Sequence, residues 1–173
     1  AMAGIGTYTK IEGFAFLPIT SFMMALTTFV SQNRGAKEYE RARKGAHFGL
    51  VCSVSLAEII GLLIALFATP LMRLFVDDPQ VIQYGVERAH YATILFFLLA
   101  YSHGVSAVLR GVGKSVVPMV VMLVCWCLVR VTLLTMLNML FYNILFVYLI
   151  YPFTWSLSSI VFFLYYRKIN WQE

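Results

Sequence analysis

The chain has 173 residues, of which 61% are hydrophobic and 12% are charged, and its formal net charge is +5. Soluble domains have about 25% charged residues and disordered segments have low hydrophobicity, so both classes are excluded. A mean hydropathy of +0.81 instead indicates an integral membrane protein. In such a protein a basic excess is typical of cytoplasmic loops, and no nucleic-acid partner is expected.

Five apolar stretches are long enough to cross the bilayer, which takes about 20 mostly apolar residues. The sequence lacks the series of alternating segments that a membrane barrel needs, so the spans are expected to be helices. The fold class predicted is all-α, a polytopic transmembrane helical bundle. The predicted spans cover residues 13–30, 48–68, 92–109, 116–137 and 141–165.

The beginning of the chain lacks the basic and apolar regions of a signal peptide, so we expect it to start partway through a longer protein. Lys10 and Glu12 then lie at the mouth of the first span. Two interpretations of Glu12 stay open: a residue of the membrane interface, or a carboxylate that faces a cavity.

The loop charges alternate along the chain. Nine of the thirteen Lys and Arg residues follow the first, third and fifth spans, whereas Lys10, Arg73 and Arg88 are assigned to the opposite side. Because loops rich in Lys and Arg face the cytoplasm, the N-terminus is expected outside and the C-terminus in the cytoplasm.

Three connecting segments predict local structure. Residues 37–44 are either a short surface helix or a solvated charged linker. Asp78 followed by Pro79 predicts a helix that begins there, with Asp78 as its N-cap. Residues 111–115, GVGKS, look like part of a phosphate-binding loop, but Val108 stands where that motif needs glycine and a membrane helix precedes it. A tight turn that uses the freedom of glycine is therefore expected.

Glu58 lies near the middle of the second span, about 15 Å deep at 1.5 Å per residue. A carboxylate at that depth is costly unless it is protonated, paired or facing water. Ser55, Gly61 and Ala65 share its helical face, which is expected to contact other helices. Glu58 is either a proton or cation site or a hydrogen-bonded packing residue.

Two more polar residues lie inside predicted spans. Arg130, in the fourth span, either partners a carboxylate or carbonyl groups of another helix or extends toward the outer interface. His103, in the third span, either relays protons or makes an interhelical hydrogen bond. Glu58, Arg130, His103 and Glu12 are the candidates for ion or proton coupling or for lining a cavity.

No catalytic set is present in the sequence, since His47, His90 and His103 fall at different predicted depths and no Asp-rich metal loop occurs. The three cysteines lie in apolar runs without metal-ligand spacing and are interpreted as packing residues. The protein is not expected to be an enzyme or to carry a cofactor.

An ordered set of short phrases extends over nearly the whole chain: YTKIE (8–12), FLPI (16–19), SQNRGA (31–36), RARKG (41–45), LFVDDPQV (74–81), LRGVGK (109–114), LVRV (128–131) and YPFTW (151–155). In this order and spacing the phrases resemble the C-terminal lobe of bacterial multidrug and toxic compound extrusion (MATE) transporters. Two features depart from that pattern: the third span has no Asp, which some members carry there, and Thr132 stands where many members have Pro.

The resemblance implies that residues 1–173 are a partial C-terminal lobe, helices eight to twelve of a twelve-helix, two-lobe antiporter in the bacterial inner membrane. Such a protein exports drugs or toxic organic compounds in exchange for Na⁺ or H⁺, and its partners are drug-like substrates, the lipid bilayer and the missing N-terminal lobe. Two alternatives stay open: a lipid-linked oligosaccharide flippase or exporter of related fold, and a non-transporting membrane subunit.

Overall fold

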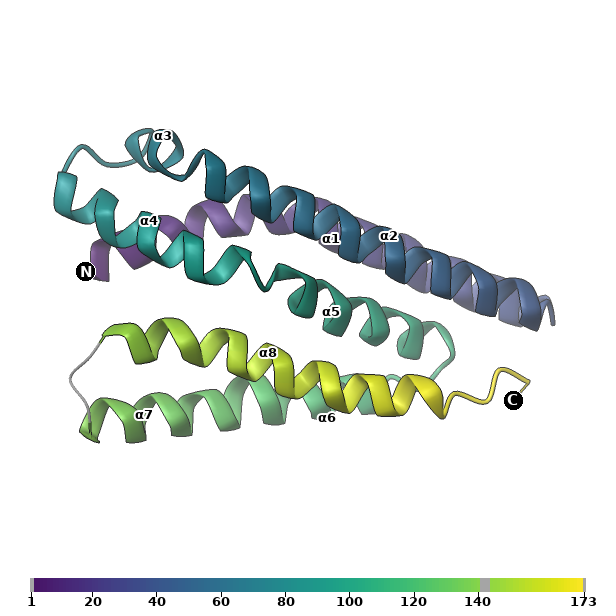
Figure 1. Ribbon diagram of the computed structural model, residues 1–173. Coiled ribbons are helices and arrows are strands. Elements are labelled where there is room, and N and C mark those ends of the chain that lie inside the picture. Colours follow the sequence, from purple (N-terminus) through teal and green to yellow (C-terminus); the bar gives the residue numbers. More distant parts are fainter. Residues whose placement is uncertain (1, 141–143, 173) are drawn as a thin grey trace.

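The computed structural model describes residues 2–140 and 144–172, and within them all regular elements are helices (Figure 1). This confirms the predicted fold class. Four helical segments are long and apolar enough to cross a membrane, and a bent pair of helices makes a fifth. The elements in chain order are α1 (Met2–Gly35), α2 (Tyr39–Leu66), α3 (Ala68–Arg73), α4 (Pro79–Thr93), α5 (Phe96–Gly111), α6 (Val116–Met122), the π-helix η1 (Leu123–Val129), α7 (Arg130–Leu140) and α8 (Ile144–Arg167).

The third span differs from its prediction. A single helix over residues 92–109 was expected, but the chain breaks between α4 and α5 at Ile94 and Leu95, where the two helices meet at 56°. The 16 residues of α5 extend about 24 Å, which is short of the roughly 30 Å hydrocarbon core. Together α4 and α5 form a bent pair that is long and apolar enough to cross the membrane. The start of the fifth predicted span, residues 141–143, lies outside the described residues.

The connecting segments follow simple local rules. Neither interpretation of residues 37–44 is right, because α2 begins at Tyr39 and its Ala42 and Ala46 are fully buried, so this segment is the first part of a long helix. The N-cap prediction is confirmed: the backbone N–H of Gln80 donates to Oδ1 of Asp78 at 2.9 Å. The predicted glycine turn is also confirmed, since Gly113 has a φ of +82°, a conformation that disfavours larger residues.

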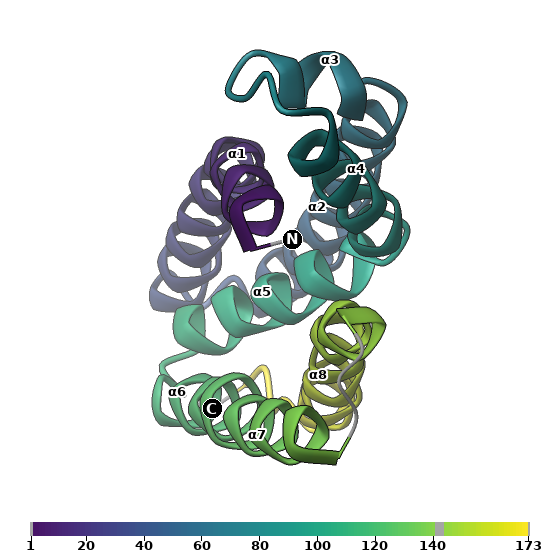
Figure 2. The same cartoon turned by 90° about the vertical axis from the view of Figure 1, so that its left-hand side faces the viewer.

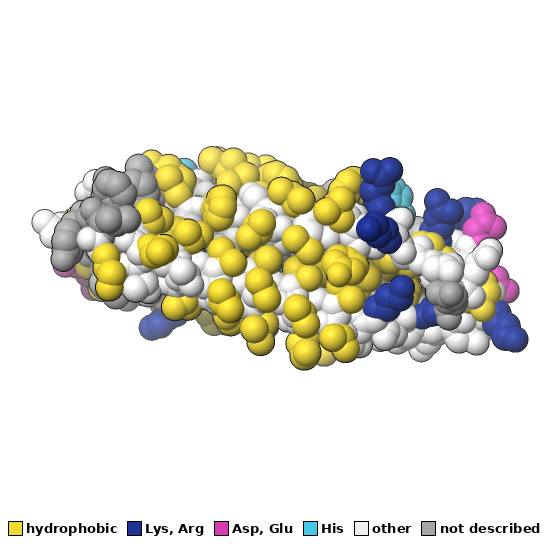
Figure 3. All heavy atoms as spheres, turned by 90° about the horizontal axis from the view of Figure 1, so that it is seen from below, with side chains coloured by type: hydrophobic (Ala, Val, Ile, Leu, Met, Phe, Trp, Pro, Cys, Tyr) yellow, Lys and Arg dark blue, Asp and Glu magenta, His cyan; other side chains and the backbone are white. Residues whose placement is uncertain are grey.

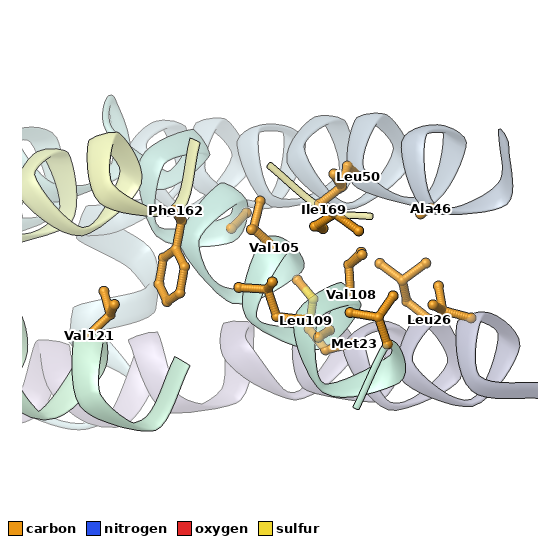
Figure 4. Close-up of a cluster of buried hydrophobic side chains, with 14 of the residues drawn as sticks. Met23, Leu26, Ala46, Leu50, Val105, Val108, Leu109, Val121, Phe162 and Ile169 are labelled. Atoms are coloured by element: carbon orange, nitrogen blue, oxygen red, sulfur yellow. The ribbon is translucent and has the colours of Figure 1, made fainter. Parts of the chain in front are cut away.

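Helix α5 is the centre of the bundle and packs against α1, α2 and α8. Viewed from the end, α6, η1 and α7 pair with α8 below the layer of α1, α2, α4 and α5 (Figure 2). The apolar core contains side chains from α1, α2, α5, α6, η1 and α8, including Met23, Leu50, Val108 and Phe162 (Figure 4). The tail after α8 returns to this core through Ile169.

The outer surface has the pattern of a membrane protein. Hydrophobic side chains cover the middle of the molecule, and Lys and Arg gather at the end that holds the C-terminus (Figure 3). The loop after α1, the loop after α5 and the tail after α8 all lie at that end (Figure 1). The fold therefore brings together the three basic segments that the sequence pattern assigns to one side.

Gly111 is expected to tolerate no side chain. A Cβ there would lie 2.8 Å from Cβ of Val30 and 2.9 Å from the backbone oxygen of Thr27, which cannot move aside. Gly111→Ala should lower the stability of the full-length protein by about 1–3 kcal/mol, because it forces α5 away from α1. The matched control is Gly35→Ala, which has open space around it. Thermal unfolding in detergent measures both, and equal melting temperatures would contradict the expected close helix contact.

Candidate functional site

Arg88 is buried inside the bundle, with 3% of its surface exposed. Its guanidinium carbon lies 4.3 Å from the ring centroid of Tyr151 on α8 and 5.5 Å from that of Tyr8 on α1. The assignment of Arg88 to an outer loop was wrong. Asp78 starts a helix that places Arg88 on the same buried face as Ala89 and Ala92.

Arg130 contacts the same tyrosine. Its guanidinium carbon is 4.6 Å from the ring centroid of Tyr151 and 5.2 Å from that of Trp126. Its Nε and Nη2 donate to Oγ1 of Thr154 at 3.2 and 2.7 Å. Arg130 thus points inward to α8, where it meets a hydroxyl group and aromatic faces. We call Tyr8, Arg88, Trp126, Arg130 and Tyr151 the cation–aromatic cluster.

The fourth span presents Trp126 and Arg130 through an unusual turn. Residues 123–129 form the π-helix η1, and Arg130 is the first residue of α7. A π-turn inserts one extra residue per turn into a helix and is frequent at functional sites. Thr132, which replaces the proline of the family pattern, donates to the backbone oxygen of Leu128 at 2.8 Å, so the helix continues through this position.

Glu12 belongs to the same interior. It lies on α1 one turn after Tyr8, is partly buried, and experiences the positive charges of both Arg88 and Arg130. Among the described residues neither arginine makes an ion pair within 4.0 Å. The interior therefore holds one carboxylate that experiences the positive charge of two guanidinium groups and forms no ion pair with either of them.

His103 extends this interior along α5. Its ring meets the ring of Phe16 at 4.9 Å and that of Trp126 at 5.1 Å, both edge to face. Its Nε2 is buried and has no hydrogen-bond partner among residues 2–140 and 144–172. His103 thus links α1 to the fourth span, next to the cation–aromatic cluster.

A chain of hydroxyl groups crosses from the cluster to α5. Trp126 Nε1 donates to Oγ of Ser158 at 3.1 Å, and Ser102 Oγ lies 2.9 Å from Oγ of both Ser158 and Ser159. Ser159 closes the chain by donating to the backbone oxygen of Leu98 at 2.9 Å. Because these bonds join α5, η1 and α8, they hold Trp126 in a fixed position beside Arg130.

Glu58 lies apart from these groups, at the break in the third span. Its Oε2 accepts a hydrogen bond from the backbone N–H of Phe97 at 3.1 Å, which is one of the free donors at the start of α5. The stripe predicted around it is buried only in part, since Gly61 is buried and Ser55 is exposed. The geometry makes Glu58 a capping residue for a broken membrane helix.

The structure therefore brings three of the four candidate residues, Glu12, His103 and Arg130, into one interior. Sequence reasoning missed Arg88, together with the three aromatic residues of the cluster. The signal for Arg88 was the helical spacing from Gly85 through Ala89 to Ala92, which marks a face of small residues suited to close packing. The described residues contain no group of three or more His, Cys, Asp and Glu side chains that could hold a metal.

A bundle of membrane-spanning helices with charged groups enclosed between them is an architecture that occurs among membrane transporters. The chain belongs to the MatE family, whose profile matches residues 1–136. This confirms the resemblance and covers α1 to most of α7.

Individual relatives agree with the family match. A probable multidrug resistance protein NorM of Thermotoga maritima is 29% identical over 70% of this chain and 26% of its own length. A probable multidrug resistance protein YoeA of Bacillus subtilis is 23% identical over the whole chain and 37% of its own length. An FAD transporter of Shewanella oneidensis is 30% identical over 49% of the chain and 19% of its own length. The chain thus spans between about a fifth and two fifths of these relatives.

Proposed function

We propose that the chain forms most of the C-terminal lobe of an antiporter in the bacterial inner membrane that exports drugs or toxic organic compounds in exchange for Na⁺ or H⁺. Membership of the MatE family carries this proposal. Two of the relatives bear the name of probable multidrug resistance proteins. Alternating access would come from two lobes that rock about a shared cavity, and the second lobe is the partner that this chain needs.

Within this lobe, Glu12 is the proposed coupling carboxylate. Its partly buried position favours the neutralised carboxylate, whereas the positive charges of Arg88 and Arg130 favour the ionised one, and this balance supports a cycle in which a cation or a proton neutralises Glu12 and is then released. Arg88 and Arg130 set the local positive charge, and the aromatic rings of Tyr151 and Trp126 hold them in place.

Efflux of a cationic dye from an efflux-deficient bacterium that expresses the full-length protein tests the proposal. Dye export should exceed that of cells with an empty vector and should depend on an imposed Na⁺ or proton gradient. Dye retention equal to that of the empty-vector cells, with the protein present in the membrane, would reject drug export.

A second candidate function is the export of an anionic compound. The finding that favours it is that a second arginine, the buried Arg88, joins Arg130 in the interior, because an interior with two arginines and one carboxylate suits a negatively charged cargo. This candidate includes the lipid-linked oligosaccharide exporters, and one relative is named an FAD transporter. A panel of cationic, neutral and phosphate-bearing compounds in the same efflux assay separates the two candidates.

The topology prediction places the basic end of the molecule in the cytoplasm. Single cysteines at Glu40 and Gln80 of the full-length protein, in a cysteine-free background, should react differently with an impermeant thiol reagent added to whole cells. Position 80 is expected to be labelled and position 40 to be protected, because the three basic segments follow the positive-inside rule. Labelling at position 40 but not at position 80 would show that the orientation in the membrane is the reverse of the predicted one.

A further inference from the structure

A cavity of about 930 Å³ lies at the basic end of the molecule, between the beginning of α2 and the tail after α8, away from the cation–aromatic cluster. Its lining residues come from two segments that are distant in sequence. They are Glu40, Arg43, Lys44, His47, Phe48 and Val51 of α2, and Tyr166, Arg167, Ile169 and Trp171 of the C-terminal segment.

The rim of this cavity carries more positive side chains than nearby carboxylates can pair with. Lys44 forms a salt bridge of 2.9 Å with Glu40, and both side chains are exposed. Arg43 and Arg167 have no carboxylate within 4.0 Å among the described residues. With His47 beside them, two guanidinium groups and an imidazole face the same space, and guanidinium groups are well suited to bind phosphate.

The remaining walls of the cavity are aromatic and apolar. Tyr166 and Trp171 meet edge to face with their ring centroids 6.4 Å apart, and buried Ile169 fixes the tail that carries Trp171. On α2, Phe48 and Val51 continue the cavity toward the apolar surface, with 71% and 53% of their surfaces exposed. Aromatic residues of this kind mark the level of the lipid headgroups.

The order of these walls along the membrane normal matches the order of groups in a phospholipid. The basic rim lies at the charged end of the molecule, the aromatic residues lie beside it, and the exposed apolar residues of α2 follow. We infer that this cavity binds the phosphate headgroup of an anionic phospholipid, with its acyl chains along Phe48 and Val51. Basic pockets between membrane helices on the cytoplasmic side are suited to such lipids.

Native mass spectrometry of the purified full-length transporter tests the inference. Phosphatidylglycerol should be retained in preference to phosphatidylcholine with the same acyl chains. The double variant Arg43→Gln and Arg167→Gln should bind phosphatidylglycerol about tenfold more weakly, because it loses both free guanidinium groups. The variant Arg43→Lys and Arg167→Lys keeps the charge and should bind within about threefold of wild type.

The matched control is the double variant Arg41→Gln and Arg110→Gln, which removes two exposed positive charges from the same end of the molecule but outside this cavity. It should retain phosphatidylglycerol as wild type does. Equal retention of phosphatidylglycerol by the cavity variant and by this control would contradict the proposed lipid site.

A second experiment uses inorganic phosphate alone in place of the lipid. If phosphate stabilises wild type against heat but not the cavity variant, and lipid retention is unchanged, the cavity takes a soluble phosphate and the assignment to lipid is wrong.

Discussion

The variant Glu12→Gln is expected to reduce ion-coupled efflux by the full-length transporter to the level of cells without it, while its amount in the membrane stays near normal. Gln has the shape of Glu but carries no negative charge to bind Na⁺ and no proton to release. Within the described part of the lobe, Glu12 is the carboxylate that Arg88 and Arg130 both influence. Uptake of a dye into energised inverted vesicles, in which export runs inward, measures the loss when Na⁺ and proton gradients are imposed separately.

Glu58→Gln is the matched control, because it changes the same chemical group in another membrane helix. The carboxylate of Glu58 accepts a hydrogen bond from the backbone N–H of Phe97, and the amide oxygen of Gln can accept the same bond. The start of α5 should therefore stay capped, and efflux should remain close to that of wild type. Normal coupling in Glu12→Gln together with lost coupling in a well-expressed Glu58→Gln would move the coupling role to Glu58.

Structural features that are set by residues close together in the sequence could be predicted from the sequence alone. Four of the five spans follow from uninterrupted hydropathy, the start of α4 from an acidic residue before a proline, and the turn at Gly113 from glycine spacing. Each of these signals acts over a few residues. For the same reason the sequence indicated that Arg130 belongs inside the membrane, because no polar stretch surrounds it.

The break between α4 and α5 could not be predicted. Residues 94–95 are Ile and Leu in an apolar run, without the proline or glycine that usually marks a kink. One group that satisfies the broken helix is Glu58, which is 39 residues away from Phe97 in the sequence. Because the sequence did not predict this break, it also did not predict that α4 joins α5 in a bent pair of membrane length. For the same reason Arg88 was assigned to a loop, whereas the structure buries it in the interior.

The cluster around Tyr151 could not be predicted either, because its members come from five elements. The elements are α1 with Tyr8, α4 with Arg88, η1 with Trp126, α7 with Arg130 and α8 with Tyr151. Each residue alone has an ordinary explanation as a packing or interface side chain. Only their arrangement in space shows that two arginines, the buried Arg88 and the partly buried Arg130, share one aromatic ring.

Tyr151→Leu is expected to cost the full-length protein about 2–4 kcal/mol of stability, since it removes the ring that both guanidinium groups contact. Tyr151→Phe should change the stability by less than about 1 kcal/mol, because the interaction uses the face of the ring and not the hydroxyl group. The matched control is Phe153→Leu on the same helix, where 55% of the aromatic side chain is exposed. Phe153→Leu should change the stability of the full-length protein little.

Thermal and denaturant unfolding of the purified full-length transporter in detergent measures all three variants. A double variant of Arg88→Met and Tyr151→Leu should lose less than the sum of the two single variants, because each change already breaks the same contact. If Tyr151→Phe is as damaging as Tyr151→Leu, the hydroxyl group and not the ring holds the arginines. Additive losses in the double variant would show that Arg88 and Tyr151 stabilise the lobe independently, and the cluster would then not act as one unit.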